Sequence, residues 1–127
     1  MEIKTHQTIS QTLCGRAVET GDGFSRVELE TTADMAVDEF NLVHGGFIFG
    51  QADYAAMIAV NDPNVVLGAA EVRFLKPVRA GQTVVAEARV SEAAGKKRQV
   101  EVTVKQGPTP VFEGRFTCFV LDRHVLS

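Results

Sequence analysis

The clearest pattern in the chain is an apolar segment at residues 47–60, which predicts a helix without a polar stripe. Its ten apolar residues point in nearly every direction around the axis: Phe47, Ile48, Phe49, Ala52, Ala55, Ala56, Met57, Ile58, Ala59 and Val60. Since a helix on a protein surface keeps one polar side, this helix is expected to be buried. Other elements must therefore wrap around it, up to the closing turn at residues 61–64.

Segments with the pattern of β-strands lie on both sides of this helix. Residues 12–20 and 24–31 are expected to form two strands joined by a turn at 21–23, and four more follow at 65–74, 83–90, 99–104 and 111–121. Short connections between successive strands are typical of an antiparallel meander. Residues 32–43 are expected to form a loop or a short helical turn, and residues 1–10 a loosely attached arm. The order predicts one α+β domain over residues 1–127, a curled antiparallel sheet around one long buried helix.

Composition and charge narrow the possible partners. The 127 residues are 45% hydrophobic and 23% charged, as in a globular domain with a full core. The apolar segment is too short to span a bilayer and the first residues lack a signal-peptide pattern, so a cytoplasmic protein without a membrane partner is expected. A net charge of −3 shows no basic excess for nucleic acid. Cys14 and Cys118 are too few for a disulfide framework and are expected to be reduced and buried.

Asp53 is the first candidate for chemistry, because it lies in the middle of this apolar helix. An isolated ionised carboxylate in such surroundings is costly. The acid must therefore face a polar cleft, be paired, or have a raised pKa. A perturbed acid in a pocket is a candidate base or nucleophile. The structural alternative is a partly exposed or hydrogen-bonded aspartate at the edge of the helix.

His44, Gly45 and Gly46 stand immediately before the helix. The first N–H groups of a helix have no partner inside it, glycines let a ligand approach the backbone, and the helix dipole favours negative charge there. These are the requirements of an oxyanion site in acyl transfer. The alternative is that the two glycines only form a sharp turn into the helix.

The segment from His44 to Asp53 resembles the H-G-G-x-x-F-x-x-A-D motif of hot-dog-fold acyl-CoA thioesterases of the phenylacetate-pathway type. The expected order of elements matches that fold over nearly the whole chain. The resemblance implies that Asp53 activates water or attacks the thioester itself, while the N–H of Gly45, together with that of Gly46, binds the carbonyl oxygen. It also implies a homodimer or a dimer of dimers (a homotetramer), with each site built between two subunits. Coenzyme A is then part of the substrate, and neither a separate cofactor nor a metal is expected.

The chain departs from that family in two places. Met57 stands one turn after the acid, where the thioesterases often have a hydroxyl residue. Well upstream of the motif, where they tend to have a polar amide, this chain offers Asp38 and, closer to the motif, Asn41. Hydratases of the same fold pair a histidine with an acid, which His44 and Asp53 could imitate. The Gly-Gly spacing favours the thioesterases.

A second resemblance supports a different class of function. Residues 70–78 and 111–116 are similar to the effector domain of the malonyl-CoA-sensing repressor of bacterial lipid synthesis, a hot-dog domain that binds acyl-CoA without hydrolysing it and lacks the helix acid. The alternative function is therefore a non-catalytic acyl-CoA sensor. Asp53 favours catalysis, and since the chain leaves no room for an N-terminal DNA-binding helix pair, a self-contained repressor is not expected.

Basic and aromatic side chains complete the candidate site. Arg73, Lys76 and Arg79 fall at a strand end and the loop after it, where they are expected to bind the phosphates of acyl-CoA. Phe49 is the candidate for the acyl pocket, although it and four other residues fit the core equally well: Phe40, Phe47, Tyr54 and Met57.

Overall fold

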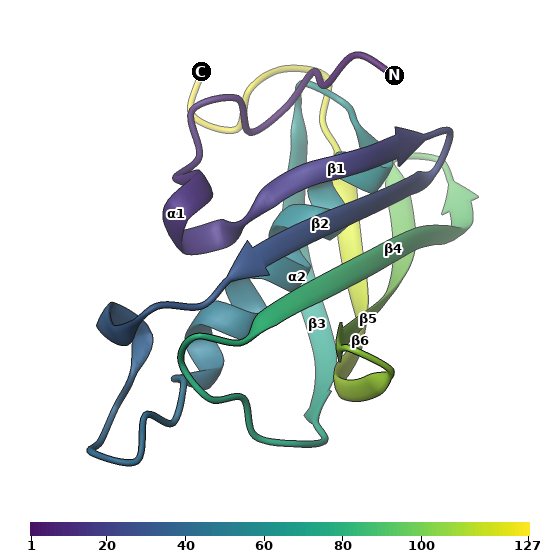
Figure 1. The fold of residues 1–127 in the computed structure, drawn as a ribbon. Helices are drawn as coiled ribbons and strands as arrows, with labels where there is room; N and C mark the ends of the chain where they lie inside the picture. Colours follow the sequence, from purple (N-terminus) through teal and green to yellow (C-terminus); the bar gives the residue numbers. More distant parts are fainter.

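The computed structural model describes residues 1–127 (Figure 1). One long helix, α2 (Gly45–Val60), is preceded by a short helix and two strands and followed by four strands. The remaining elements are α1 (Gln11–Cys14), β1 (Arg16–Gly21), β2 (Phe24–Glu30), the short 3₁₀ turn Ala33–Met35, β3 (Val65–Phe74), β4 (Thr83–Ala94), β5 (Lys97–Gln106) and β6 (Thr109–Val120). None of the helices is long and apolar enough to cross a membrane.

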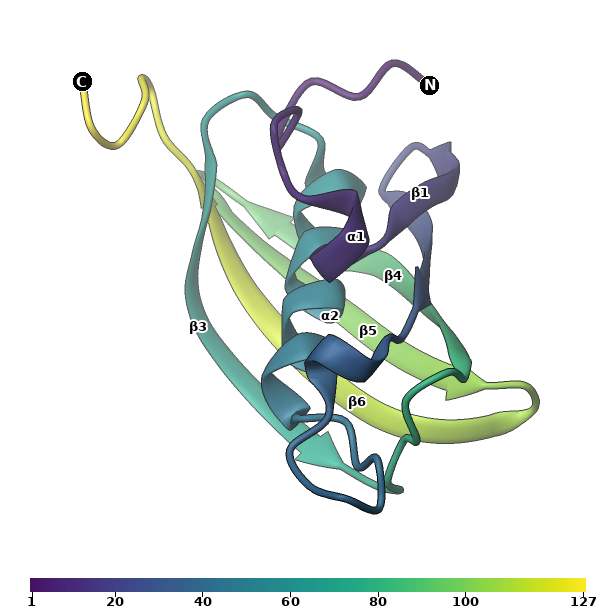
Figure 2. The same ribbon diagram turned by 60° about the vertical axis from the view of Figure 1, so that its left-hand side comes forward.

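All six strands form a single antiparallel sheet in the order β1-β2-β4-β5-β6-β3. The sheet curls around α2, which lies on its concave face (Figure 2). The α+β hot-dog fold expected from the sequence is therefore confirmed. Its two edge strands are β1 and β3, so β3 pairs with β6 on one side only.

Three boundaries differ from the sequence prediction. Residues 12–20 do not form one strand, because the Ser10 side chain accepts a hydrogen bond from the Leu13 N–H and caps the helical turn α1. Helix α2 begins at Gly45 rather than Phe47, since His44 supplies its cap. The hairpin between β4 and β5 extends to a tight turn after Ala94, which makes both strands longer than expected.

The core lies between α2 and the sheet. Four alanines of the helix are at most 2% exposed, and their small side chains let its backbone lie close to the strands: Ala52, Ala55, Ala56 and Ala59. Val100, Val102 and Val104 alternate with polar residues along β5 and are all buried, as the period of two predicts. Phe112 and Phe116 are the largest fully buried side chains of the neighbouring strand β6.

Two buried polar side chains tie α2 to β2 and β4. The amide nitrogen of Gln51 donates to the carbonyl oxygens of Val27 and Val84, each at 3.0 Å. The hydroxyl of Ser25 donates to the Ala55 carbonyl at 2.6 Å. Since Gln51 and Ser25 are completely buried, these bonds set the position of the helix along the strands.

The first ten residues, expected to be loosely attached, make specific contacts at the C-terminal end of α2. Asn61, in a left-handed conformation with φ 53°, accepts from the Lys4 N–H and donates to the Glu2 carbonyl. Thr5 is only 6% exposed. Both chain termini lie at this end of the molecule, opposite the N-terminal end of α2 (Figures 1 and 2).

We expect Gln51→Met to lower the free energy of unfolding by about 2–4 kcal/mol, because a side chain of similar shape leaves two buried carbonyls without their donor. Urea unfolding of this variant beside the exposed control Glu92→Gln measures the difference. Equal stability of the two variants would mean that the Gln51 bonds contribute nothing.

Candidate active site

The N-terminal end of α2 offers one unused backbone donor. The His44 Nδ1 atom accepts a hydrogen bond from the Gly46 N–H at 2.8 Å, so that N–H is already engaged. The Phe47 N–H donates to the His44 carbonyl. The Gly45 N–H has no acceptor within the chain. Of the two glycines expected to bind an oxyanion, Gly45 is the one whose donor is free in the positive field of the helix end.

The backbone of Gly45 lines a groove of about 330 Å³. The ring of Phe74 lies 3.0 Å from the point where a Cβ on Gly45 would stand, so only glycine fits there without moving the ring. Phe74 rests edge-on against Phe112, with ring centroids 5.1 Å apart, and keeps 56% of its surface exposed. The rest of the lining is largely apolar: Leu42, Val43, Ile48, Leu75, Lys76, Pro77, Val78 and Val111.

Asp53 lies two turns further along α2, where its carboxylate is half-buried. Its Oδ1 atom is enclosed and has no hydrogen-bond partner. Burial raises the pKa of Asp53 from its ordinary value of 3.8 to about 6. Burial also raises the pKa of Cys118, to about 12, and the Asp53 charge adds to that shift. Asp53 is therefore the perturbed acid anticipated from the sequence, and no basic side chain compensates its charge.

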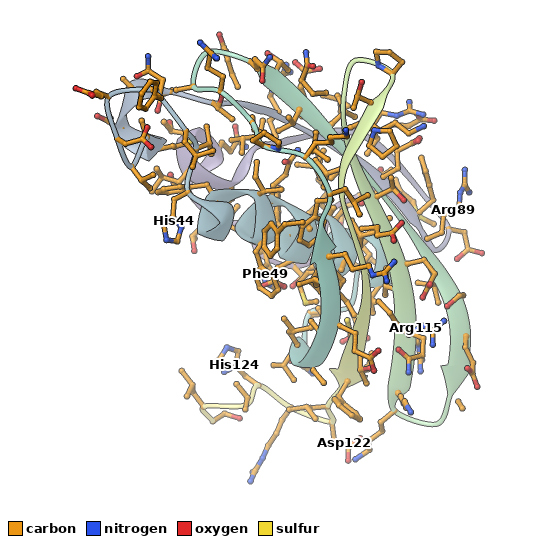
Figure 3. The ribbon with its side chains drawn as sticks, turned by 90° about the horizontal axis from the view of Figure 1, so that it is seen from below. His44, Phe49, Arg89, Arg115, Asp122 and His124 are labelled. Atoms are coloured by element: carbon orange, nitrogen blue, oxygen red, sulfur yellow. The ribbon has the colours of Figure 1, made fainter.

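Some of the aromatic and apolar residues considered for the acyl pocket lie in the core and others lie on the surface. Phe49 lies one turn before Asp53, and its ring is 5.5 Å from that of the buried Phe116, which places it between α2 and the sheet (Figure 3). Tyr54 and Met57 are at most 4% exposed and belong to the core, whereas Phe40 is 74% exposed in the loop before the helix.

The three basic candidates do not share one surface. Lys76 and Arg79 are exposed in the loop after β3, and Lys76 lines the groove of Gly45. Arg73 faces the outer side of the sheet, where it pairs with Glu113 at 3.7 Å. It shares a hollow there with Arg115, which Figure 3 shows on the side of the sheet away from α2. Because side chains alternate along β3, Arg73 lies on the outer face while the next residue, Phe74, lines the groove of Gly45 with Lys76.

The upstream polar residues lie in the loop that leads into α2. Asn41 is exposed and left-handed, with φ 65°, and its carbonyl accepts from the Ala80 N–H. Its side-chain amide makes no hydrogen bond within the chain, so it is available to a ligand. The Asp38 carboxylate instead accepts from the N–H groups of Phe40 and Leu42. These bonds stabilise the turn before α2 and give Asp38 a structural role.

The distance between donor and acid decides which groups of one chain can act on the same bond. Gly45 and Asp53 are eight residues apart in one continuous helix. At 1.5 Å per residue their backbones are separated by about 12 Å along the axis. One thioester carbonyl cannot contact both groups of the same chain, because each must lie about 3 Å from the reacting atoms.

Comparisons with known proteins identify the family of the chain. The model of the thioesterase superfamily matches residues 40–113. Among solved structures, an uncharacterized protein of Pyrococcus horikoshii has 54% identity and a TM-score of 0.99, covering 100% of this chain and 98% of that one. A point mutant of the phenylacetic acid degradation protein PaaI from Thermus thermophilus has 26% identity and a TM-score of 0.80, covering 87% and 96%.

Curated relatives are longer proteins. A protein of Aquifex aeolicus named methylthioribose-1-phosphate isomerase is 51% identical over 123 residues, which are 96% of this chain and 27% of that protein. The transcription factor FapR of Caldanaerobacter subterraneus is 32% identical over 77% of this chain and 49% of its own length. The chain thus spans half or less of these relatives.

The raised pKa of Asp53 predicts a stability that depends on pH. Between about pH 4 and pH 6 the folded protein holds this proton more tightly than the unfolded chain does, so its contribution to stability falls as the pH rises. Asp53→Asn removes the titration. We expect the variant to match the wild type near pH 4 and to be more stable at pH 8, by about 1–3 kcal/mol.

Urea unfolding of both proteins at the two pH values measures this difference, in which the other carboxylates cancel. A variant less stable than the wild type at pH 8 would show that the ionised carboxylate is stabilised by a partner after all.

Proposed function

Because the chain belongs to the thioesterase superfamily, we propose that it hydrolyses an acyl-CoA thioester to the free acid and CoA. The observation that carries this proposal is the enclosed, unpartnered carboxylate of Asp53 with its pKa of about 6. Above that pH the group is ionised and poorly solvated, which makes it more basic than an exposed aspartate. The vacant Gly45 N–H supplies the second requirement, a donor for negative charge on the carbonyl oxygen.

The reaction needs one proton acceptor and one oxyanion donor. With Asp53 as base, a water oxygen adds to the carbonyl carbon while its proton passes to the carboxylate, and the Gly45 N–H binds the resulting O⁻. When the C=O bond re-forms, the C–S bond breaks and the sulfur of CoA receives the proton from Asp53. With Asp53 as nucleophile, its carboxylate oxygen adds to the carbonyl carbon and the C–S bond breaks, which gives an anhydride and CoA thiolate. Water then hydrolyses the anhydride, which releases the acid and regenerates the Asp53 carboxylate, and the thiolate takes up the proton that this step sets free. Both routes use the same two groups.

The separation of about 12 Å along the helix supports a homodimer as the active unit. In such a dimer, Gly45 of one copy and Asp53 of the second copy act on the same thioester. Strand β3 supports the assembly, because its outer edge is unpaired and residues 68–71 at its centre are exposed. A free edge with the small residues Gly68, Ala69 and Ala70 is suited to pairing with another strand.

The non-catalytic alternative rests on a specific likeness. FapR is named as a transcription factor, and this chain resembles 49% of its length. An acyl-CoA sensor of this fold needs the groove at Gly45 but has no use for an unpartnered carboxylate. Release of free thiol from short-chain, long-chain and aryl acyl-CoA, beside a binding measurement on the same panel, separates the two functions.

The role of Asp53 predicts the effect of its amide variant. We expect Asp53→Asn to lower kcat at least about 100-fold. The variant lacks the carboxylate that accepts the proton of water in one route and attacks the carbonyl carbon in the other. The wild-type kcat/KM is expected to rise as the pH passes about 6 and to level off above it, because Asp53 must be ionised. Steady-state thiol release from pH 5 to 9 measures both. Near-normal turnover by the variant would return Asp53 to a structural role.

The loop after β3 predicts how CoA is held. We expect Lys76→Ala and Arg79→Ala to raise KM for acyl-CoA while kcat stays nearly constant, as when uniform binding is lost. Arg73→Ala is the matched control, because its side chain lies on the other face of the sheet with Glu113. Kinetics on acyl-CoA and on a truncated acyl-pantetheine, which lacks the nucleotide phosphates, test the assignment.

The truncated substrate should not distinguish Lys76→Ala or Arg79→Ala from the wild type. Rising salt should increase the wild-type KM for acyl-CoA, since exposed charge contacts are screened. If both variants lose kcat on both substrates, or if Arg73→Ala behaves as they do, this loop does not hold the phosphates.

A further inference from the structure

Gly50 is a glycine that the chain itself does not explain. Of the eleven glycines, five have positive φ, and four others have a neighbour within 3.0 Å of where a Cβ would stand: Gly45, Gly46, Gly68 and Gly114. Two remain, Gly21 at the end of β1 and Gly50 in the interior of α2. A Cβ on Gly50 would meet nothing within 4 Å. Glycine is unfavourable in a helix interior, so something outside the chain is needed to account for it.

In the middle of α2, the side of the helix that the rest of the chain leaves uncovered is the side of Gly50. Its neighbours Ile48 and Gln51 are buried against the sheet, and Phe49 turns its ring to Phe116. Gly50 is therefore the point where the middle of the helix offers bare backbone to an approaching group.

The proposed shared site determines which group approaches Gly50. Two identical sites, each made from Gly45 of one copy and Asp53 of the other, require a twofold axis that exchanges these positions. The axis must then pass near the midpoint of the segment from Gly45 to Asp53, which is residue 49. At a twofold axis a helix meets its own copy, so the two α2 helices cross antiparallel at this point.

We propose that Gly50 is the crossing point of the α2 helices of two copies, and that its missing side chain sets how closely they approach. The proposal rests on the proposed function, since the shared site defines the axis. Small residues at a crossing let helix backbones approach, whereas larger ones hold them apart. A close crossing brings Gly45 of one copy and Asp53 of the other within reach of one thioester carbonyl. Gly50 is in this sense a positioning residue for the reaction.

Two substitutions of increasing size test the crossing in the full chain. Gly50→Ala favours the helix intrinsically, so weaker association cannot come from a weaker helix. Gly50→Leu adds a larger obstacle. We expect the dimer dissociation constant from analytical ultracentrifugation to rise from wild type to alanine to leucine, at least tenfold for leucine. kcat/KM should fall in the same order, with helicity by circular dichroism unchanged. Gly21→Ala, the other glycine with room for a Cβ, is the matched control and should behave as the wild type.

Other outcomes overturn the proposal. Tight dimers of Gly50→Leu with normal turnover would show that the helices do not cross there. Tight dimers with a raised KM would assign the space at Gly50 to the substrate. A wild-type dimer that releases no thiol refutes the hydrolase proposal alone, because the association of the Gly50 variants still decides where the helices cross.

Discussion

Close packing of one helix inside a curled sheet is the constraint on which the structure depends. Helix α2 can lie against the strands only because alanines cover much of its surface. This arrangement leaves little room for polar groups, and the polar side chains of the core differ in whether they find a hydrogen-bond partner. Gln51 and Ser25 bond to backbone carbonyls and so fasten the helix to the sheet. Asp53 receives no such partner, and its carboxylate stays poorly solvated.

Helix α2 carries both groups of the candidate chemistry. Burial that secures α2 also raises the pKa of Asp53, because the charged form loses water that no hydrogen bond replaces. At the N-terminal end of the helix, the His44 ring accepts from the Gly46 N–H and leaves the Gly45 N–H without an acceptor. The helix therefore carries an acid and an oxyanion donor fixed at a set spacing, and it is this rigidity that makes a second copy necessary in the proposed reaction.

Much of the fold could be predicted from the sequence, since two strong patterns define it. The all-apolar segment identified α2, and alternation in segments such as 99–104 identified the strands around it. The motif also singles out Asp53, whose carboxylate is half-buried without a partner, and Gly45, whose N–H is free, while their roles in catalysis stay predictions. Short-range side-chain bonds were harder to anticipate: the Ser10 cap turned an expected strand into α1, and the His44 ring occupied the Gly46 N–H. Arg73 was grouped with Lys76 by closeness in sequence, although alternation along β3 puts it on the opposite face.

The location of the chain ends constrains how this domain can be joined to others. Both termini lie beside the C-terminal end of α2, where Asn61 anchors the first residues. A neighbour fused at either end would therefore be tethered at the pole of the molecule opposite Gly45 and its groove. The domain can be built into a longer polypeptide, as in the Aquifex aeolicus relative, of which the matched residues form 27%. In such a chimaera the linker enters far from the substrate groove, so the fused partner can vary without crowding it.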